Sequence, residues 1–100
     1  MTTAPDRGWQ PTAELGTLRR RADALATARK FFATRNILEC ETPVIVRHPV
    51  SDPRLCNVRC ELAVRPGVPH YLQTSPEYHM KRLLAAGFPD LYQICKVFRD

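Results

Sequence analysis

The chain has 100 residues, of which 44% are hydrophobic, 25% charged and 8% aromatic, an ordinary globular composition that excludes disordered, collagen-like and membrane-embedded proteins. A chain of this length buries enough surface for at most one domain with a modest core. Fifteen basic against ten acidic residues give a net charge of +5, but the basic residues form no stripe of the kind that indicates nucleic-acid binding.

The N-terminal third of the chain predicts a loose arm followed by one helix. Residues 1–14 combine proline and glycine with few apolar side chains, which indicates an irregular N-terminal arm. Over residues 15–35, apolar side chains recur every three or four positions and arginines occupy the other face, so we predict an amphipathic helix. Asn36 follows where a left-handed C-terminal cap is expected, and asparagine is the best non-glycine residue for that conformation.

The middle of the chain predicts short strands separated by loops. Side chains alternate over residues 37–43, which predicts a strand that ends at Pro43 because proline cannot donate to a ladder. Several prolines make residues 47–69 a loop-rich insertion, with one weak strand over residues 58–64. A further short strand is predicted at residues 71–72.

The last quarter of the chain predicts a helix and a final strand. Ser75 is a good N-cap, Pro76 suits the first helical position, and Gly87 suits the C-terminal cap. Residues 91–100 carry hydrophobic side chains on both faces, which predicts a strand inside a sheet that is covered on both sides. No sequence remains to pair with that strand, so we expect the chain to be a fragment of a larger domain.

Four cysteines suggest either a disulfide framework or a zinc site. The N-terminal sequence MTTAPDRGWQ has no apolar run of signal-peptide length and no stretch could span a membrane, so we expect a reducing cytoplasm and no membrane association. Cys56 and Cys60 have C-x3-C spacing, but Cys40 and Cys95 lie in apolar runs where a thiol usually packs as a small hydrophobe. We therefore assign no metal-ligating residue.

The order of these elements resembles the catalytic domain of class II aminoacyl-tRNA synthetases of the lysyl subgroup. The stretch RNILECETP resembles the first signature motif, and ICKVFRD resembles the start of the second. More specifically, TSPEYHMKRLLAAG is similar to the elongation factor P lysine ligases, a paralogous family. The resemblance runs from residue 9 to residue 100 and implies an α+β fold, in which residues 15–100 are the N-terminal part of an antiparallel sheet with flanking helices. The sequence departs from the family at Asn36, usually glycine, and at FRD, usually FRN-E.

The resemblance implies an ATP-dependent ligase that activates lysine or β-lysine as an adenylate and transfers it to a lysine of elongation factor P. Lysyl-tRNA synthetases carry an anticodon-binding barrel ahead of this region, and the fourteen residues before Leu15 are too few for one. If Met1 is the true start, a protein acceptor is favoured over tRNA. The alternatives are a fragment of lysyl-tRNA synthetase and a non-catalytic dimerisation module. The isolated chain is expected to be inactive.

The resemblance also implies site residues. Arg99 is expected to be the catalytic arginine that binds the α-phosphate of ATP, with Asp100 adjoining it in the ATP site. Ser75, Pro76 and Glu77 are expected to bind the amino acid, with the Glu77 carboxylate on an ammonium group.

The resemblance further implies partners and a cofactor. The region of Pro43 is expected to lie at the interface of a homodimer, and Mg²⁺ is expected with ligands beyond Asp100. No serine or cysteine nucleophile is implied, because the amino acid substrate supplies the nucleophile.

The residues alone leave a plainer interpretation open. Without the resemblance, Arg99 is a surface arginine that ends a strand, Ser75 is only a helix cap, and Glu77 is only a favourable acid in a first helical turn. His79 and Lys81 lie on the same predicted helix and are expected to be structural or electrostatic, because position on a helix does not assign proton transfer.

Overall fold

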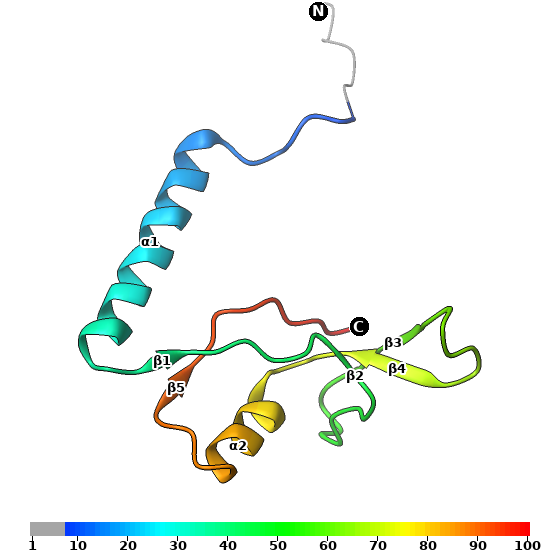
Figure 1. Cartoon of the computed structure of the whole chain (residues 1–100). Helices are drawn as coiled ribbons and strands as arrows, with labels where there is room; N and C mark the ends of the chain where they lie inside the picture. Colours follow the sequence, from blue (N-terminus) through cyan, green and yellow to red (C-terminus); the bar gives the residue numbers. More distant parts are fainter. Residues whose placement is uncertain (1–7) are drawn as a thin grey trace, which may run out of the picture. The chain divides into compact units, whose positions relative to one another are not determined.

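The structure is a computed structural model that describes residues 8–100, and Figure 1 shows its elements. The first half of the predicted N-terminal arm, residues 1–7, lies outside the described residues. The chain divides into two compact units, Met1–Phe31 and Phe32–Asp100, and each is described by itself. Among the described residues, no helix is both long and apolar enough to cross a membrane.

The predicted N-terminal helix is confirmed as α1, which spans Leu15–Thr34. Residues 8–14 ahead of it form neither helix nor strand. Its predicted apolar face is covered only toward its C-terminal half: Leu25 and Ala28 are half-buried, whereas Leu18 is 50% exposed. The reason is that residues 8–31 contain no second helix or strand on which this face could pack.

The end of α1 connects to a two-stranded parallel pair. Asn36 has a φ of 59°, the left-handed conformation that the sequence predicted for it. Strand β1 (Leu38–Glu39) follows and pairs in parallel with β5 (Leu91–Tyr92). The prediction of a strand that continues to Pro43 is therefore wrong beyond Glu39, because β5 ends at Tyr92 and offers no further strand to pair with. The ring of Phe32 in the last turn of α1 stacks on that of Tyr92, with centroids 4.0 Å apart. A parallel pair was not predicted, and it brings two segments far apart in the sequence side by side.

The other three strands form an antiparallel sheet in the order β2-β4-β3. Strand β3 (Val58–Glu61) and strand β4 (Pro69–Leu72) form a hairpin, where the sequence predicted a weak strand and a short strand. Strand β2 (Ile45–Val46) was not predicted, and it pairs with the other edge of β4. The mixed α and β composition therefore agrees with the predicted class.

Helix α2 spans Glu77–Ala85 and follows β4 after a short turn. Its N-cap is Pro76 rather than the predicted Ser75, because the Pro76 carbonyl already accepts the first helical hydrogen bond, from Met80 at 3.0 Å. The Ser75 hydroxyl nevertheless accepts a hydrogen bond from the Glu77 amide at 3.2 Å. Gly87 just beyond the helix has a φ of 92°, as expected for a glycine cap.

The prediction of one strand over residues 91–100 is wrong beyond Tyr92. The backbone of this segment bonds to two different parts of the chain: the Phe98 amide donates to Gln73 at 2.9 Å and the Asp100 amide donates to Cys56 at 3.0 Å. A continuous strand needs one neighbouring strand along its whole length, and none is present among the described residues. Figure 1 shows this segment, in red, running back toward the antiparallel sheet.

Gln73, directly after β4, connects the elements of the second unit. Its backbone amide donates to the Val44 carbonyl at 2.8 Å, and its side-chain Nε2 donates to the Lys96 carbonyl at 2.8 Å. Only 2% of this residue is exposed, whereas no hydrophobic residue among residues 8–100 is fully buried. The buried residues of this unit are therefore polar, namely His70, Gln73 and Thr74.

We expect Gln73→Leu to lower the free energy of unfolding by about 1 to 2 kcal/mol, because the Lys96 carbonyl loses its hydrogen-bond donor. The measurement uses the protein as the cell makes it. Urea unfolding measures this change. Gln10→Leu, at an exposed position, is the matched control and should leave the unfolding free energy nearly unchanged. Equal stability of both variants would contradict the role of Gln73.

Candidate functional site

The turn between β4 and α2 carries the three residues predicted to bind the amino acid. Ser75 and Pro76 are half-buried, and Glu77 is the first residue of the helix. These residues lie between Leu72, where β4 ends, and the first turn of α2, which begins at Glu77. The turn thus joins two regular elements, and sites supported by such elements are positioned more precisely than sites on long loops.

A cavity of about 150 Å³ opens at this turn. Its lining residues are Val50, Asp52, Leu55, Thr74, Ser75, Glu77 and Tyr78. Of the predicted residues, Ser75 and Glu77 line it and Pro76 does not. The lining contains two carboxylates and no basic side chain, so the cavity suits a cationic group such as an ammonium.

Thr74 supplies an additional polar group at this cavity. It is only 1% exposed, and its Oγ1 has no hydrogen-bond partner among the described residues. Buried polar groups are nearly always hydrogen-bonded, and leaving one without a partner costs free energy. The buried hydroxyl of Thr74 therefore leaves a hydrogen bond unmade beside this cavity.

Glu77 already has a cationic partner in this structure. Its carboxylate lies 2.8 Å from the Lys81 ammonium one helical turn away, and both side chains are mostly exposed. The hydrogen bond and the charge of Glu77 raise the pKa of Lys81 above its ordinary value. This agrees with the expected electrostatic role of Lys81, and a substrate ammonium would have to compete with it.

Arg99 and Asp100, predicted for the ATP site, are exposed and do not line this cavity. Their backbone is nevertheless tied to the same region, since the neighbouring Phe98 amide bonds to Gln73, two positions before Ser75. Arg99 forms no ion pair with any of residues 8–100, so its guanidinium is available for a phosphate.

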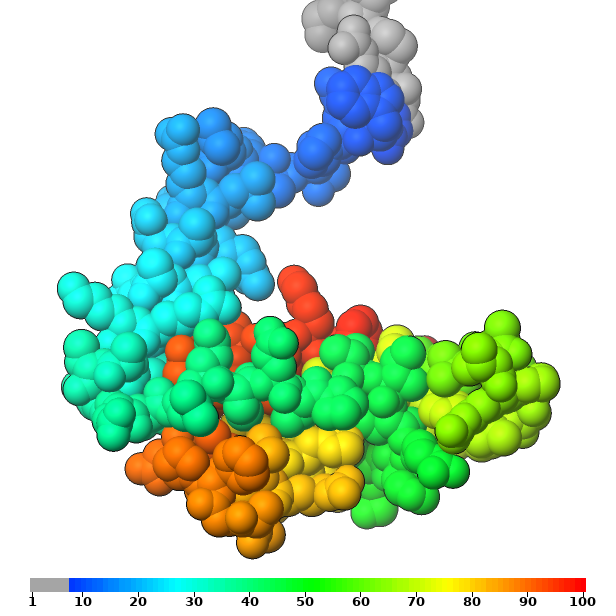
Figure 2. Space-filling view, viewed as in Figure 1, coloured from blue at the N-terminus to red at the C-terminus, as the bar shows by residue number. Residues whose placement is uncertain are grey.

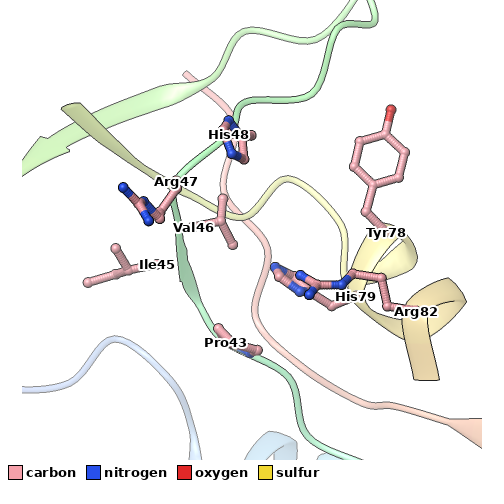
Figure 3. Close-up of a pocket in the computed structure, with 8 residues that line it drawn as sticks. All are labelled: Pro43, Ile45, Val46, Arg47, His48, Tyr78, His79 and Arg82. Carbon is pink, nitrogen blue, oxygen red and sulfur yellow. The ribbon is translucent and has the colours of Figure 1, made fainter. Parts of the chain in front are cut away.

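A larger cavity of about 440 Å³ lies between β2 and α2, beside the segment that Figure 2 shows in green against the yellow and orange helix. Figure 3 shows His79 and Arg82 projecting from the helix toward β2. The lining residues of this larger cavity are Pro43, Ile45, Val46, Arg47, His48, Tyr78, His79 and Arg82. Because this lining is basic and contains no carboxylate, it disfavours an ammonium, and the smaller cavity is the better candidate for an amino acid site.

The candidate metal ligands do not come together. Within the part of the chain that the structure describes, no three histidine, cysteine or acidic side chains are grouped so that they could hold a metal ion. All four cysteines are free. Cys40 is half-buried as expected, but Cys95 is exposed, because the segment that carries it is not inside a sheet.

Five residues of the cavity were missed by the sequence analysis, namely Val50, Asp52, Leu55, Thr74 and Tyr78. Asp52 precedes a proline and was interpreted only as part of a loop, and nothing local indicates that this loop reaches the start of α2. Thr74 is the first residue of the stretch TSPE, and this position next to the predicted site residues was the sequence feature that could have indicated it.

Comparison with known proteins places the sequence of this chain in a family. The model of the family described as tRNA synthetases class II (D, K and N) matches residues 12–100. The chain is 47% identical over 96 residues to the elongation factor P--(R)-beta-lysine ligase of Vibrio atlanticus, and equally so to that of Edwardsiella ictaluri. It is 45% identical over 95 residues to that of Erwinia tasmaniensis. Each alignment covers 92% of this chain and 29% of the relative.

We expect the pKa of Lys81 to lie above 10.5, and Glu77→Gln to lower it toward that value, because the hydrogen-bonding carboxylate is lost. Since the folded-state pKa is raised, the stabilising effect of the pair is present below 10.5 and is lost as the pH rises through the raised value. NMR titration of the Lys81 side chain measures the shift. Glu61→Gln, whose carboxylate pairs with Arg59, should leave the Lys81 pKa unchanged.

Proposed function

Because the chain belongs to the class II tRNA synthetases (D, K and N), we propose that the protein as the cell makes it activates lysine or β-lysine with ATP and transfers it to a lysine of elongation factor P. The observation that carries this proposal is the 45 to 47% identity to elongation factor P ligases across nearly the whole chain. The chain spans 29% of the length of those relatives.

The proposed reaction has two steps. In the first, a carboxylate oxygen of the amino acid attacks the α-phosphorus of ATP, a P–O bond breaks, and pyrophosphate leaves behind an aminoacyl-adenylate. In the second, a lysine amine of elongation factor P attacks the adenylate carbonyl, an amide bond forms, and AMP leaves as the amine loses a proton. The chain supplies no covalent nucleophile, so its residues bind, orient and balance charge.

Arg99 and Asp100 are the residues that we assign to ATP. The Arg99 guanidinium can donate two parallel hydrogen bonds to the α-phosphate and balance the charge that builds up in the transition state. Support comes from its exposure and from the absence of an ion pair with residues 8–100. Asp100 adjoins it through the backbone that bonds to Cys56.

The amino acid is proposed to bind at the β4–α2 turn. Glu77 pairs with an ammonium of the substrate and Ser75 orients it, while Pro76 sets the start of the helix that positions both. The support is the cavity that Ser75 and Glu77 line together, whose charge is of the sign that attracts an ammonium.

Two other functions are less well supported. A lysyl-tRNA synthetase that charges tRNA belongs to the same broad family, but the relatives at 44 to 47% identity carry the ligase name. A non-catalytic dimerisation module has no need for the acidic cavity or for an arginine without an ion-pair partner.

The setting of the reaction is also proposed. Residues 8–100 contain no group of three or more histidine, cysteine or acidic side chains that could hold a metal ion, and no step here depends on Mg²⁺. We place the reaction in the cytoplasm and the ligands of Mg²⁺, which the family uses with ATP, outside this chain. The exposed apolar run at Pro43, Val44 and Ile45 supports a homodimer interface at this segment.

We expect Arg99→Lys to lower the rate of adenylate formation about tenfold or more while leaving the melting temperature unchanged, because the charge remains but the two-pronged phosphate contact is lost. ATP–pyrophosphate exchange with lysine measures this rate in the protein as the cell makes it. Arg65→Lys, in the exposed turn before β4, is the matched control. A normal exchange rate in the Arg99 variant would remove Arg99 from the site.

We expect Glu77→Gln to weaken lysine binding roughly thirty-fold, or by about 2 kcal/mol, because an ammonium in the cavity loses its counter-charge. A purely structural role in the first helical turn would cost only about 1 kcal/mol of stability and no affinity. Calorimetric titration with lysine and thermal melting of the same sample separate the two roles. Glu61→Gln, which does not line the cavity, is the control, and equal lysine affinity in the two variants would contradict the ligand role.

A further inference from the structure

We propose that Gln73 is a positioning residue for Arg99, because its side-chain amide fixes the segment that carries this arginine and so sets where the guanidinium meets ATP. The inference rests on the proposed function and deepens it, since it concerns how the ATP-binding arginine is held. Gln73 acts through Arg99 and is not itself placed against a substrate.

Arg99 lies in a C-terminal segment that forms neither helix nor strand, so its position depends on individual hydrogen bonds (Figure 1). The amide before it, that of Phe98, donates to the Gln73 carbonyl at 2.9 Å. The amide after it, that of Asp100, donates to the Cys56 carbonyl at 3.0 Å. Any residue type could make these two contacts, because only backbone atoms take part.

A third contact to this segment requires the glutamine side chain. Gln73 Nε2 donates to the Lys96 carbonyl at 2.8 Å and lies 3.6 Å from Cys95 Sγ. Gln73 is only 2% exposed, so water competes little for this hydrogen bond. Its Oε1 has no hydrogen-bond partner among residues 8–100, so Nε2 alone holds the amide. Because hydrogen bonds are directional, this one fixes the backbone three positions before Arg99.

The side chains of the same segment give it little packing. Lys96, Val97 and Arg99 are exposed, and Phe98 is half-buried. Without the Lys96 contact, the segment therefore loses one of the few contacts that set its path. A guanidinium that donates two parallel hydrogen bonds to a phosphate needs accurate placement, and a shift of about 1 Å can lower a rate about a hundredfold.

The amino acid side of the site does not depend on this side chain. Ser75 and Glu77 are connected to Gln73 through the backbone, and the Gln73 amide donates to the Val44 carbonyl at 2.8 Å whatever the side chain is. Neither Gln73 nor Lys96 lines the cavity at the β4–α2 turn. A change of the Gln73 side chain should therefore impair the activation of ATP and spare lysine binding, a difference that a general loss of structure would not give.

The test uses Gln73→Met in the protein as the cell makes it. Methionine is unbranched and adaptable, so it fills the space of glutamine while it removes the donor. Gln73→Asn is a second variant, whose amide is one methylene too short for the Lys96 carbonyl. Gln93→Met, which removes a hydrogen bond to Thr42 instead, is the matched control. ATP–pyrophosphate exchange gives kcat/KM for ATP, calorimetry gives the lysine affinity, and thermal melting checks the fold.

We expect both Gln73 variants to lower kcat/KM for ATP about tenfold or more and to leave the lysine affinity unchanged to within about twofold. Gln93→Met should leave both quantities unchanged. In a protein that already carries Arg99→Lys, Gln73→Met should cause little further loss, because residues that act through one contact are not additive. A merely structural role would lower the rate by the same factor in both backgrounds.

An unchanged exchange rate in the Gln73 variants, an equal loss of lysine affinity, or additive losses in the double variant would overturn the inference and leave the proposed function standing. Failure of both Gln73 variants to fold would also overturn it, because Gln73 would then serve the fold alone. If Arg99→Lys exchanges normally, the ATP role of Arg99 fails and the inference fails with it. If the unmutated protein shows no exchange with lysine or β-lysine, the proposed function itself fails.

Discussion

The second unit depends on the hydrogen bonds of Gln73, which lies where β4 ends and the approach to α2 begins. Its backbone amide and carbonyl bond to Val44 and Phe98, and its side chain bonds to Lys96. Through these hydrogen bonds, Gln73 joins the segment before β2 to the C-terminal segment. Because Ser75 and Glu77 follow within four positions, the same contacts that hold this unit together also position the candidate site.

A second glutamine, Gln93, connects the segment after β5 to the segment after β1. Gln93 donates from Nε2 to the Thr42 hydroxyl at 3.0 Å, and its Oε1 accepts from the Thr42 amide at 3.3 Å, across 51 positions of sequence. Such polar contacts have directional geometry, which sets the register between segments where no fully buried apolar side chain among residues 8–100 does so. The apolar side chains of Leu38, Val44 and Ile45 stay exposed and form surfaces that further protein could cover.

The candidate site was predictable only where its residues lie close together in the sequence. Ser75 and Glu77 belong to one motif, and the structure does bring both to one cavity. Asp52 reaches that cavity from a loop more than twenty positions earlier, and no local pattern encodes such an approach. The final strand was predicted too long for the same reason: alternation of apolar side chains is a local signal, whereas a strand also requires a neighbour of matching length.

The sequence by itself determined the two helices, the left-handed Asn36 and the glycine cap at Gly87, because each follows from contacts between residues a few positions apart. It also determined the family, through motifs that are contiguous in the chain. Only the tertiary structure decided the parallel pairing of β1 with β5, the contacts of Gln73 and the position of Asp52 at the cavity that Glu77 also lines. These depend on which distant segments come together, and the free energy of that choice is spread over many weak contacts that no short stretch of sequence contains.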